Sequence, residues 1–388
     1  MRIIASIKSP SGLLLIAVVL GLAAANSPIQ SFVMALINTA PSTCLGSACF
    51  ALTFQSGVEI FGVSAFFYLV GLELKRELTG GALTPLRNAI SPLFAAILGV
   101  LMPALWYLAF NFGQSTQDGW PIPTATDVTF ALAVFVAFGS ALPQAARTFL
   151  LAFAVIDDVI AVIIVGVMFT GSHLGFPFGF WPILIPFAAF LVLQRTGVQG
   201  TLGKFVALLA VIFLGIALLF TSLAGIEPAL LAVVAALFTP KSQIAEVESR
   251  LGPQVTYWIL PLFAFIAAFV KIPATGSIVW PVLIGITARP IWKFVGVFLG
   301  GWIGGRFATG SMRLTKHALW RVAALGGIGF TVSLLVAKLA FAAAGPNGGN
   351  PAAQGTAVLA TLLASIISVV LGAIALARGH RTQSTDRA

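Results

Sequence analysis

Long apolar stretches alternate with short polar connections along nearly the whole chain. A helix needs about 20 consecutive apolar residues to cross a bilayer. Stretches of this length predict twelve membrane-spanning helices, and nothing long enough for a separate soluble domain remains between them. We therefore expect one transmembrane domain over residues 1–388. The expected spans lie at roughly residues 11–30, 57–75, 89–111, 120–142, 147–170, 178–195, 201–221, 223–239, 252–270, 278–303, 319–343 and 354–377.

Composition and the positions of basic residues favour the same class of protein. Hydrophobic residues make up 59% of the chain and charged residues 8%, which excludes an ordinary soluble domain. A net charge of +10 would suggest a nucleic-acid partner in a soluble chain, but here basic residues gather in alternate connections, for example at Arg76, Arg147 and Lys241. By the positive-inside rule we expect a bacterial inner-membrane protein with both termini cytoplasmic and no nucleic-acid partner. The charged start at Arg2 and Lys8 is also typical of a signal peptide, but we expect it to stay as the first span.

Two adjacent carboxylates, Asp157 and Asp158, lie in the middle of one of these apolar stretches. A charged side chain at the centre of a membrane helix costs about 2.5 to 3.5 kcal/mol even on lenient scales. Ionisable residues at this depth usually mark the path of an ion or a proton. The pair therefore predicts a transporter.

Two apolar stretches carry signals that interrupt a helix. Pro121 and Pro123 come shortly before Asp127, and three glycines lie within Gly326–Thr331. Non-helical backbone at membrane depth survives only inside protein or beside a water-filled cavity, and matched interruptions in two halves of a transporter indicate its binding site. We expect inverted repeats over roughly residues 89–170 and 278–377, with broken helices 4 and 11. The glycines alone would also fit close helix packing.

Half-helix ends carry partial charges that need partners. Asp127 is placed to neutralise helix N-termini, and Arg289 is placed to neutralise C-termini or to pair with an aspartate. Glu59, Lys293 and Lys338 are expected to reach water by extending their side chains, so we assign them no role.

These features together resemble one family along nearly the full length of the chain, the NhaA-type sodium/proton antiporters. The resemblance implies a twelve-helix inverted-repeat fold in which broken helices 4 and 11 cross beside the ion site. It also implies that Asp158 is the main cation ligand, that Asp157 assists, and that Thr126 and Asp127 lie at the crossing. A homodimer with a short external β-hairpin is a further implication. The matching stretches are residues 69–78, 125–127, 154–158, 259–265 and 327–333.

The chemistry of the residues fits this function independently. Sodium is a hard cation that prefers carboxylate, hydroxyl and carbonyl oxygens, which Asp158, Thr126 and freed backbone carbonyls offer. Protons compete for the same carboxylate lone pairs, and such competition at a site with alternating access is antiport. Two proton-binding carboxylates for each cation, Asp157 and Asp158, predict electrogenic exchange of cytoplasmic Na⁺ or Li⁺ for external H⁺, for sodium and pH homeostasis, with no cofactor.

The chain departs from the family pattern at two charged positions. Arg289 occupies a position that is usually Lys, and Arg does not release its proton in proteins. Glu227 occupies a position that is commonly a His linked to pH response. Other residues match family positions connected with pH response, although charged helix ends are more often simply solvated. These residues are Glu73, Arg76, Glu77 and Glu248.

Both cysteines, Cys44 and Cys49, belong to an expected external hairpin at roughly residues 42–55. A two-residue turn at Gly46-Ser47 would place Cys44 opposite Cys49 in the close register, where a disulfide is geometrically possible. Two unpaired thiols are an equally good interpretation.

An enzyme is not expected. Adjacent residues on a helix diverge by about 100°, whereas the two carboxylates of an aspartyl protease converge. Three scattered histidines, His173, His317 and His380, form no zinc motif. The remaining alternative is a sodium- or proton-coupled symporter of a small solute, because broken helices and inverted repeats serve both classes.

Overall fold

The structure is a computed structural model, and it describes residues 10–40, 42–45, 48–80, 86–139, 142–168, 181–195, 200–223, 227–308, 314–341 and 349–385. The described chain is helical apart from two short strands and divides into two compact units. The first unit comprises Met1–Gly12, Glu77–Ala161 and Val270–Ala388, and the second comprises Leu13–Arg76 and Val162–Phe269.

The first unit contains the residues that the sequence singles out for ion binding. Its long helices are interrupted by 3₁₀ turns and by non-helical backbone. The elements are α6 (Leu86–Asn111), η2 (Gln117–Gly119), η3 (Ile122–Thr124), α7 (Val128–Phe138), α8 (Gln144–Met168, up to Ala161), η5 (Thr275–Ser277), α14 (Trp280–Thr287), α15 (Arg289–Gly304), α16 (Lys316–Ala323), α17 (Thr331–Phe341) and α18 (Pro351–Thr385).

The second unit holds the two strands and the helices that follow them. Strand β1 pairs antiparallel with β2, and the backbone of Cys44 lies opposite that of Cys49. The side chains of both cysteines lie outside the described residues, so their bonding stays a prediction. The elements are α2 (Pro10–Ala25), α3 (Gln30–Asn38), β1 (Ser42–Leu45), β2 (Ala48–Ala51), α4 (Phe54–Gly57), η1 (Val58–Gly62), α5 (Val63–Gly80), α9 (Trp181–Arg195), α10 (Gly200–Leu223), α11 (Pro228–Phe238), α12 (Lys241–Gln254), η4 (Val255–Ile259) and α13 (Leu260–Ala268).

Several helices have the length and composition of membrane spans. Among the described residues, 6 helices qualify, or up to 7 if the bent pair Gly12–Ala25 and Gln30–Asn38 is one span. Four shorter apolar helices accompany them. The chain is therefore a multi-pass helical membrane protein.

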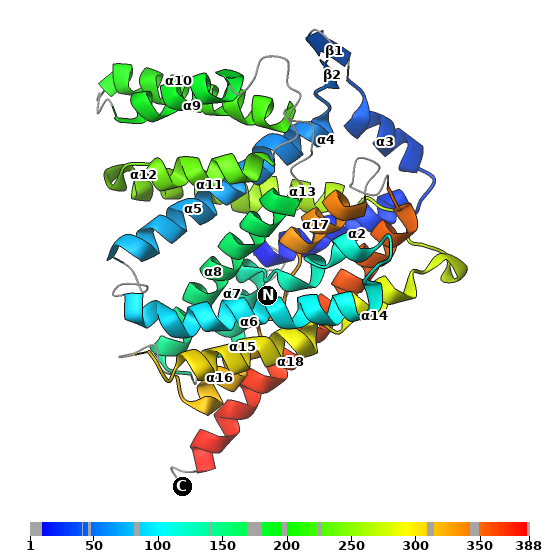
Figure 1. Cartoon of the computed structure of the whole chain (residues 1–388), viewed down its shortest axis with the longest axis vertical. Coiled ribbons are helices and arrows are strands. Elements are labelled where there is room, and N and C mark those ends of the chain that lie inside the picture. Colours follow the sequence, from blue (N-terminus) through cyan, green and yellow to red (C-terminus); the bar gives the residue numbers. More distant parts are fainter. Residues whose placement is uncertain are drawn as a thin grey trace, which may run out of the picture. The chain divides into compact units, whose positions relative to one another are not determined.

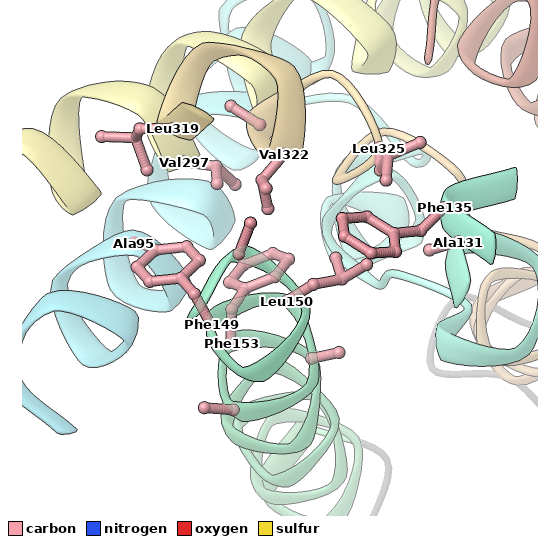
Figure 2. Packing of buried hydrophobic residues seen from close by; sticks show 14 of the residues in the cluster. Ala95, Ala131, Phe135, Phe149, Leu150, Phe153, Val297, Leu319, Val322 and Leu325 are labelled. Atoms are coloured by element: carbon pink, nitrogen blue, oxygen red, sulfur yellow. The ribbon is translucent and has the colours of Figure 1, made fainter. Parts of the chain in front are cut away.

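An apolar core in the first unit fixes α8 against its neighbours. Figure 2 shows Phe149 and Phe153 of α8 among the side chains of Val297 from α15 and Val322 from α16. All four side chains are completely buried. Each of these buried side chains makes many dispersion contacts, so the packing of this cluster is a main source of stability around Asp157.

Helices α6 and α15 lie side by side and pack unusually closely (Figure 1). Three glycines spaced four residues apart on α15 face the α6 backbone: Gly296, Gly300 and Gly304. A Cβ atom built on Gly300 would lie 2.1 Å from the carbonyl oxygen of Phe94. Small residues permit such backbone contact in membranes, where association depends on packing rather than on the hydrophobic effect. The contact fixes Arg289 and Lys293 of α15 in position relative to α6.

Candidate functional site

Two non-helical segments of the first unit meet through backbone and side-chain hydrogen bonds. Residues 125–127 separate η3 from α7, and residues 324–330 separate α16 from α17. The Asp127 N–H donates to the Ile328 carbonyl at 2.7 Å, and the Thr126 hydroxyl donates to the Gly326 carbonyl at 2.8 Å. Backbone groups that leave the helical ladder at both segments are thereby partly satisfied by each other.

The Asp127 carboxylate lies at the start of two helices. Its Oδ1 accepts from the Phe130 N–H of α7 at 3.3 Å, and its Oδ2 accepts from the Thr331 N–H and hydroxyl of α17 at 3.4 and 3.0 Å. Helix N-termini carry partial positive charge and orphan N–H donors. Asp127 therefore accepts hydrogen bonds from the starts of both helices, and its neutralisation of their partial charges stays a prediction.

Asp157 connects three elements of the site. Its Oδ2 accepts from the Thr126 N–H at 2.9 Å and lies 2.7 Å from Lys293 Nζ, whose distance to Oδ1 is 3.0 Å. Lys293 also donates to the Thr124 carbonyl. Both side chains of the ion pair are 0% exposed. An ion pair without water is sustained only by good geometry and further hydrogen bonds, and this one has both.

Asp158 follows Asp157 on α8 and is 4% exposed. Successive helical side chains point about 100° apart, so Asp158 leaves α8 in a different direction from Asp157, and it interacts electrostatically with Lys293. Asp157 is thus the member of the pair that forms a close ion pair with Lys293. In the parts of the chain that the structure describes, no three His, Cys, Asp or Glu side chains form a cluster of the kind that holds a tightly bound metal.

Arg289 is also completely buried, but its hydrogen-bond partners are neutral oxygens. It donates to the hydroxyl groups of Ser333 at 3.1 Å and Ser365 at 2.7 Å, and to the Thr361 carbonyl at 3.3 Å. Ser333 donates onward to the Ile122 carbonyl at 2.8 Å, and Ser365 donates to the Gly329 carbonyl. Arg289 is therefore linked through the two serines to the carbonyls of Ile122 in η3 and of Gly329 in the segment 324–330. Its interaction with Asp127 is electrostatic rather than a close ion pair among the described contacts.

The structure corrects the sequence-based interpretation of the two basic residues on α15. The expectation that Lys293 reaches water is wrong, because its side chain is 0% exposed and pairs with Asp157. Arg289 was expected to neutralise helix C-termini or pair with an aspartate. Its described hydrogen bonds include none to a carboxylate, and neutralisation of helix C-termini stays a prediction. The sequence does contain one signal for Lys293: it is four residues after Arg289, so both side chains lie on the same face of α15.

The residues matched to pH response are only partly brought together. In the second unit, Arg76 lies 2.5 Å from Glu248 and 3.7 Å from Glu73, with the Arg76 side chain 49% exposed. Glu227 belongs to the same unit but precedes α11, where it is the N-cap residue. Glu77 is counted in the first unit. Exposed ion pairs contribute little to stability, so these charged side chains are treated as the solvated end of a helix.

Comparison with known proteins identifies the family to which these features belong. The family model described as Na⁺/H⁺ antiporter 1 matches residues 2–376. A sodium/proton antiporter NhaA 2 from Clavibacter michiganensis is 37% identical over 398 residues, covering 100% of this chain and 94% of the relative. An NhaA antiporter from a Shewanella species is 35% identical over 375 residues, covering 93% and 92%, and one from Salmonella arizonae is 36% identical over 330 residues, covering 80% of each. The chain belongs to the NhaA-type sodium/proton antiporter family.

Proposed function

We propose that this sodium/proton antiporter exchanges cytoplasmic Na⁺ or Li⁺ for external H⁺ at Asp157 and Asp158, and that the exchange is electrogenic. The observation that carries the proposal is the buried charge at the crossing. Three carboxylates, Asp127, Asp157 and Asp158, and two cations, Arg289 and Lys293, lie there with at most 6% exposure. When all five are ionised they leave one uncompensated negative charge, so the site attracts a cation.

Asp127 and Arg289 are fixed parts of this arrangement. Asp127 accepts hydrogen bonds from two helix starts, and Arg289 donates to hydroxyl and carbonyl oxygens on α17 and α18. Arg keeps its proton under all ordinary conditions. The groups left to bind and release ions are Asp158 and the Asp157–Lys293 pair.

Exchange is electrogenic if the bound cation is coordinated by Asp157, which breaks the ion pair between Asp157 and Lys293. A sodium ion held between Asp158 and Asp157, with Thr126 and nearby carbonyls as further oxygen ligands, removes the carboxylate that sustains Lys293 as a buried cation. Lys293 then releases its proton, and Asp158 has released one as well. Two protons leave for each Na⁺ that binds, and the reverse occurs on the other side of the membrane.

We also propose the finer architecture that the family resemblance implies. The non-helical segments precede α7 and α17, and each lies in the middle member of a three-span set, which supports inverted repeats and twelve spans. A homodimer, cytoplasmic termini and an inner-membrane location belong to the same proposal. A pH-responsive role of Glu73, Arg76, Glu77, Glu248 and Glu227 also belongs to this proposal, and it rests on the family resemblance.

Transport in proteoliposomes tests the electrogenic exchange. Sodium should drive proton movement with no organic solute present, and an inside-negative or inside-positive potential set with potassium and valinomycin should change its rate in the wild type. Asp158→Asn should abolish exchange. Asp157→Asn combined with Lys293→Gln should leave exchange that no longer responds to the potential, because one proton site remains for each cation.

Two outcomes would contradict the proposal. Potential-independent exchange by the wild type would overturn the electrogenic mechanism. Strict dependence of sodium movement on an added solute would indicate a symporter. Arg250→Gln serves as the control, because Arg250 pairs only at the surface with Glu246 and should not alter the response to potential.

A further inference from the structure

Two cations lie against one indole ring where α15 meets α16. The guanidinium carbon of Arg306 is 4.0 Å from the centroid of the Trp302 ring, and Nζ of Lys316 is 5.6 Å from it. Cations at these distances are attracted by the negative face of the ring. The contact orders two long side chains that would otherwise sample many rotamers. The ring thus presents two positive groups together at the surface.

Neither cation has a negative partner in the described parts of the chain. The ion pairs found there include none from Arg306, Lys316 or Arg321, and the side chains of Arg306 and Lys316 are exposed. Arg321 extends the positive charge along the short helix α16. Like charges held close together repel, and an external anion would relieve that repulsion. Stacking on the ring also leaves the N–H donors of Arg306 available in their fork arrangement.

The depth of this corner selects the kind of anion. Trp280–Gly304 has the length and composition of a membrane span, and Arg306 follows its last residue by two positions. Phe307 is 62% exposed and Trp320 is 43% exposed. Tryptophan beside basic residues is typical of the boundary between hydrocarbon and headgroups. At that level the abundant anion is the phosphate of a lipid.

We propose that the corner formed by Trp302, Arg306 and Lys316 binds the phosphate headgroup of an anionic phospholipid. Arg306 offers two parallel N–H groups to phosphate oxygens, and Lys316 adds a point charge. Exposed Phe307 and Trp320 provide apolar surface for the adjoining part of the lipid. The role is separate from ion exchange, since Arg306 and Lys316 lie beyond the membrane end of α15, whereas Lys293 lies within the span.

Binding to the purified full chain tests this site. Phosphatidylglycerol added to detergent-solubilised protein should raise Tm and appear as bound lipid in native mass spectra, whereas phosphatidylcholine should do neither. Arg306→Gln combined with Lys316→Gln should weaken phosphatidylglycerol binding on the order of 30-fold, because each basic residue near an anionic lipid surface contributes about fivefold. Lys241→Gln removes an exposed cation at the start of α12 and should leave binding unchanged.

The single substitution Arg306→Lys separates a designed contact from a general positive charge. It keeps the charge and loses the fork, so it should weaken binding severalfold while leaving Tm without lipid unchanged. Equal binding of phosphatidylglycerol by wild type and the double variant would overturn the proposal. So would equal binding of phosphatidylcholine, or displacement of the lipid by inorganic phosphate at matched concentration, which would indicate a site for the free anion.

Discussion

Replacing Lys293 with alanine is expected to destabilise the antiporter by about 3 to 5 kcal/mol, because removing one partner of a buried ion pair leaves an uncompensated charge. Asp157 would keep its hydrogen bond from the Thr126 N–H but lose both contacts from Lys293 Nζ, at 2.7 and 3.0 Å. The Thr124 carbonyl would lose a donor as well. Chemical or thermal unfolding of the purified protein measures the loss.

Neutralising both partners distinguishes a charge effect from a packing effect. Asp157→Asn combined with Lys293→Gln retains polar groups of similar size, so most of the lost stability should return. Arg250→Ala breaks a surface pair whose side chains are 73% and 60% exposed, and it should cost less than about 1 kcal/mol. A Lys293→Ala protein that unfolds no more readily than Arg250→Ala would contradict the buried ion pair.

Gly300→Ala is expected to reduce the amount of folded protein severely. A Cβ atom at this position would lie 2.1 Å from the Phe94 carbonyl oxygen and 2.6 Å from its carbon, both in the α6 backbone. Backbone cannot move aside as a flexible side chain does, so the cost should reach or exceed the roughly 1 to 3 kcal/mol of ordinary overpacking. Helix α15 would have to shift away from α6, which would displace Lys293 from Asp157.

The control for Gly300 lies on another helix. A Cβ atom at Gly252 of α12 has nothing within 4 Å, so Gly252→Ala should be neutral or stabilise the helix by up to about 1 kcal/mol. Size-exclusion elution and Tm of the two variants give the comparison. Wild-type elution and Tm for Gly300→Ala would show that α6 and α15 do not pack as closely as described.

The acidic residues and Arg289 could be singled out from the sequence, whereas Lys293 could not. Asp157 and Asp158 stand out because charge within an apolar span is costly, and Asp127 stands out because it follows two prolines. A lysine in a span is ambiguous, since its long side chain can extend to water or turn inward. Only the position of α8 against α15 shows that Lys293 turns inward to Asp157.

Ser333 and Ser365 illustrate a second limit of sequence analysis. A serine in a membrane helix usually bonds to its own backbone, so its presence indicates no partner. Here the Ser333 hydroxyl connects Arg289 to the Ile122 carbonyl of η3, and the Ser365 hydroxyl connects it to the Gly329 carbonyl, over sequence separations from 36 to 211 residues. Such links depend on the tertiary arrangement and cannot be predicted from the local residue pattern.

Proton release on sodium binding shows whether Na⁺ and H⁺ compete for Asp157 and Asp158. Sodium chloride added to weakly buffered, purified protein should release protons that an indicator dye detects, and N-methylglucamine chloride at equal ionic strength should release none. We expect release of up to two protons for each Na⁺ bound by the wild type and none by Asp158→Asn. Sodium binding of unchanged affinity without proton release across the pH range would contradict this expectation, because the two ions would then not compete for Asp157 and Asp158.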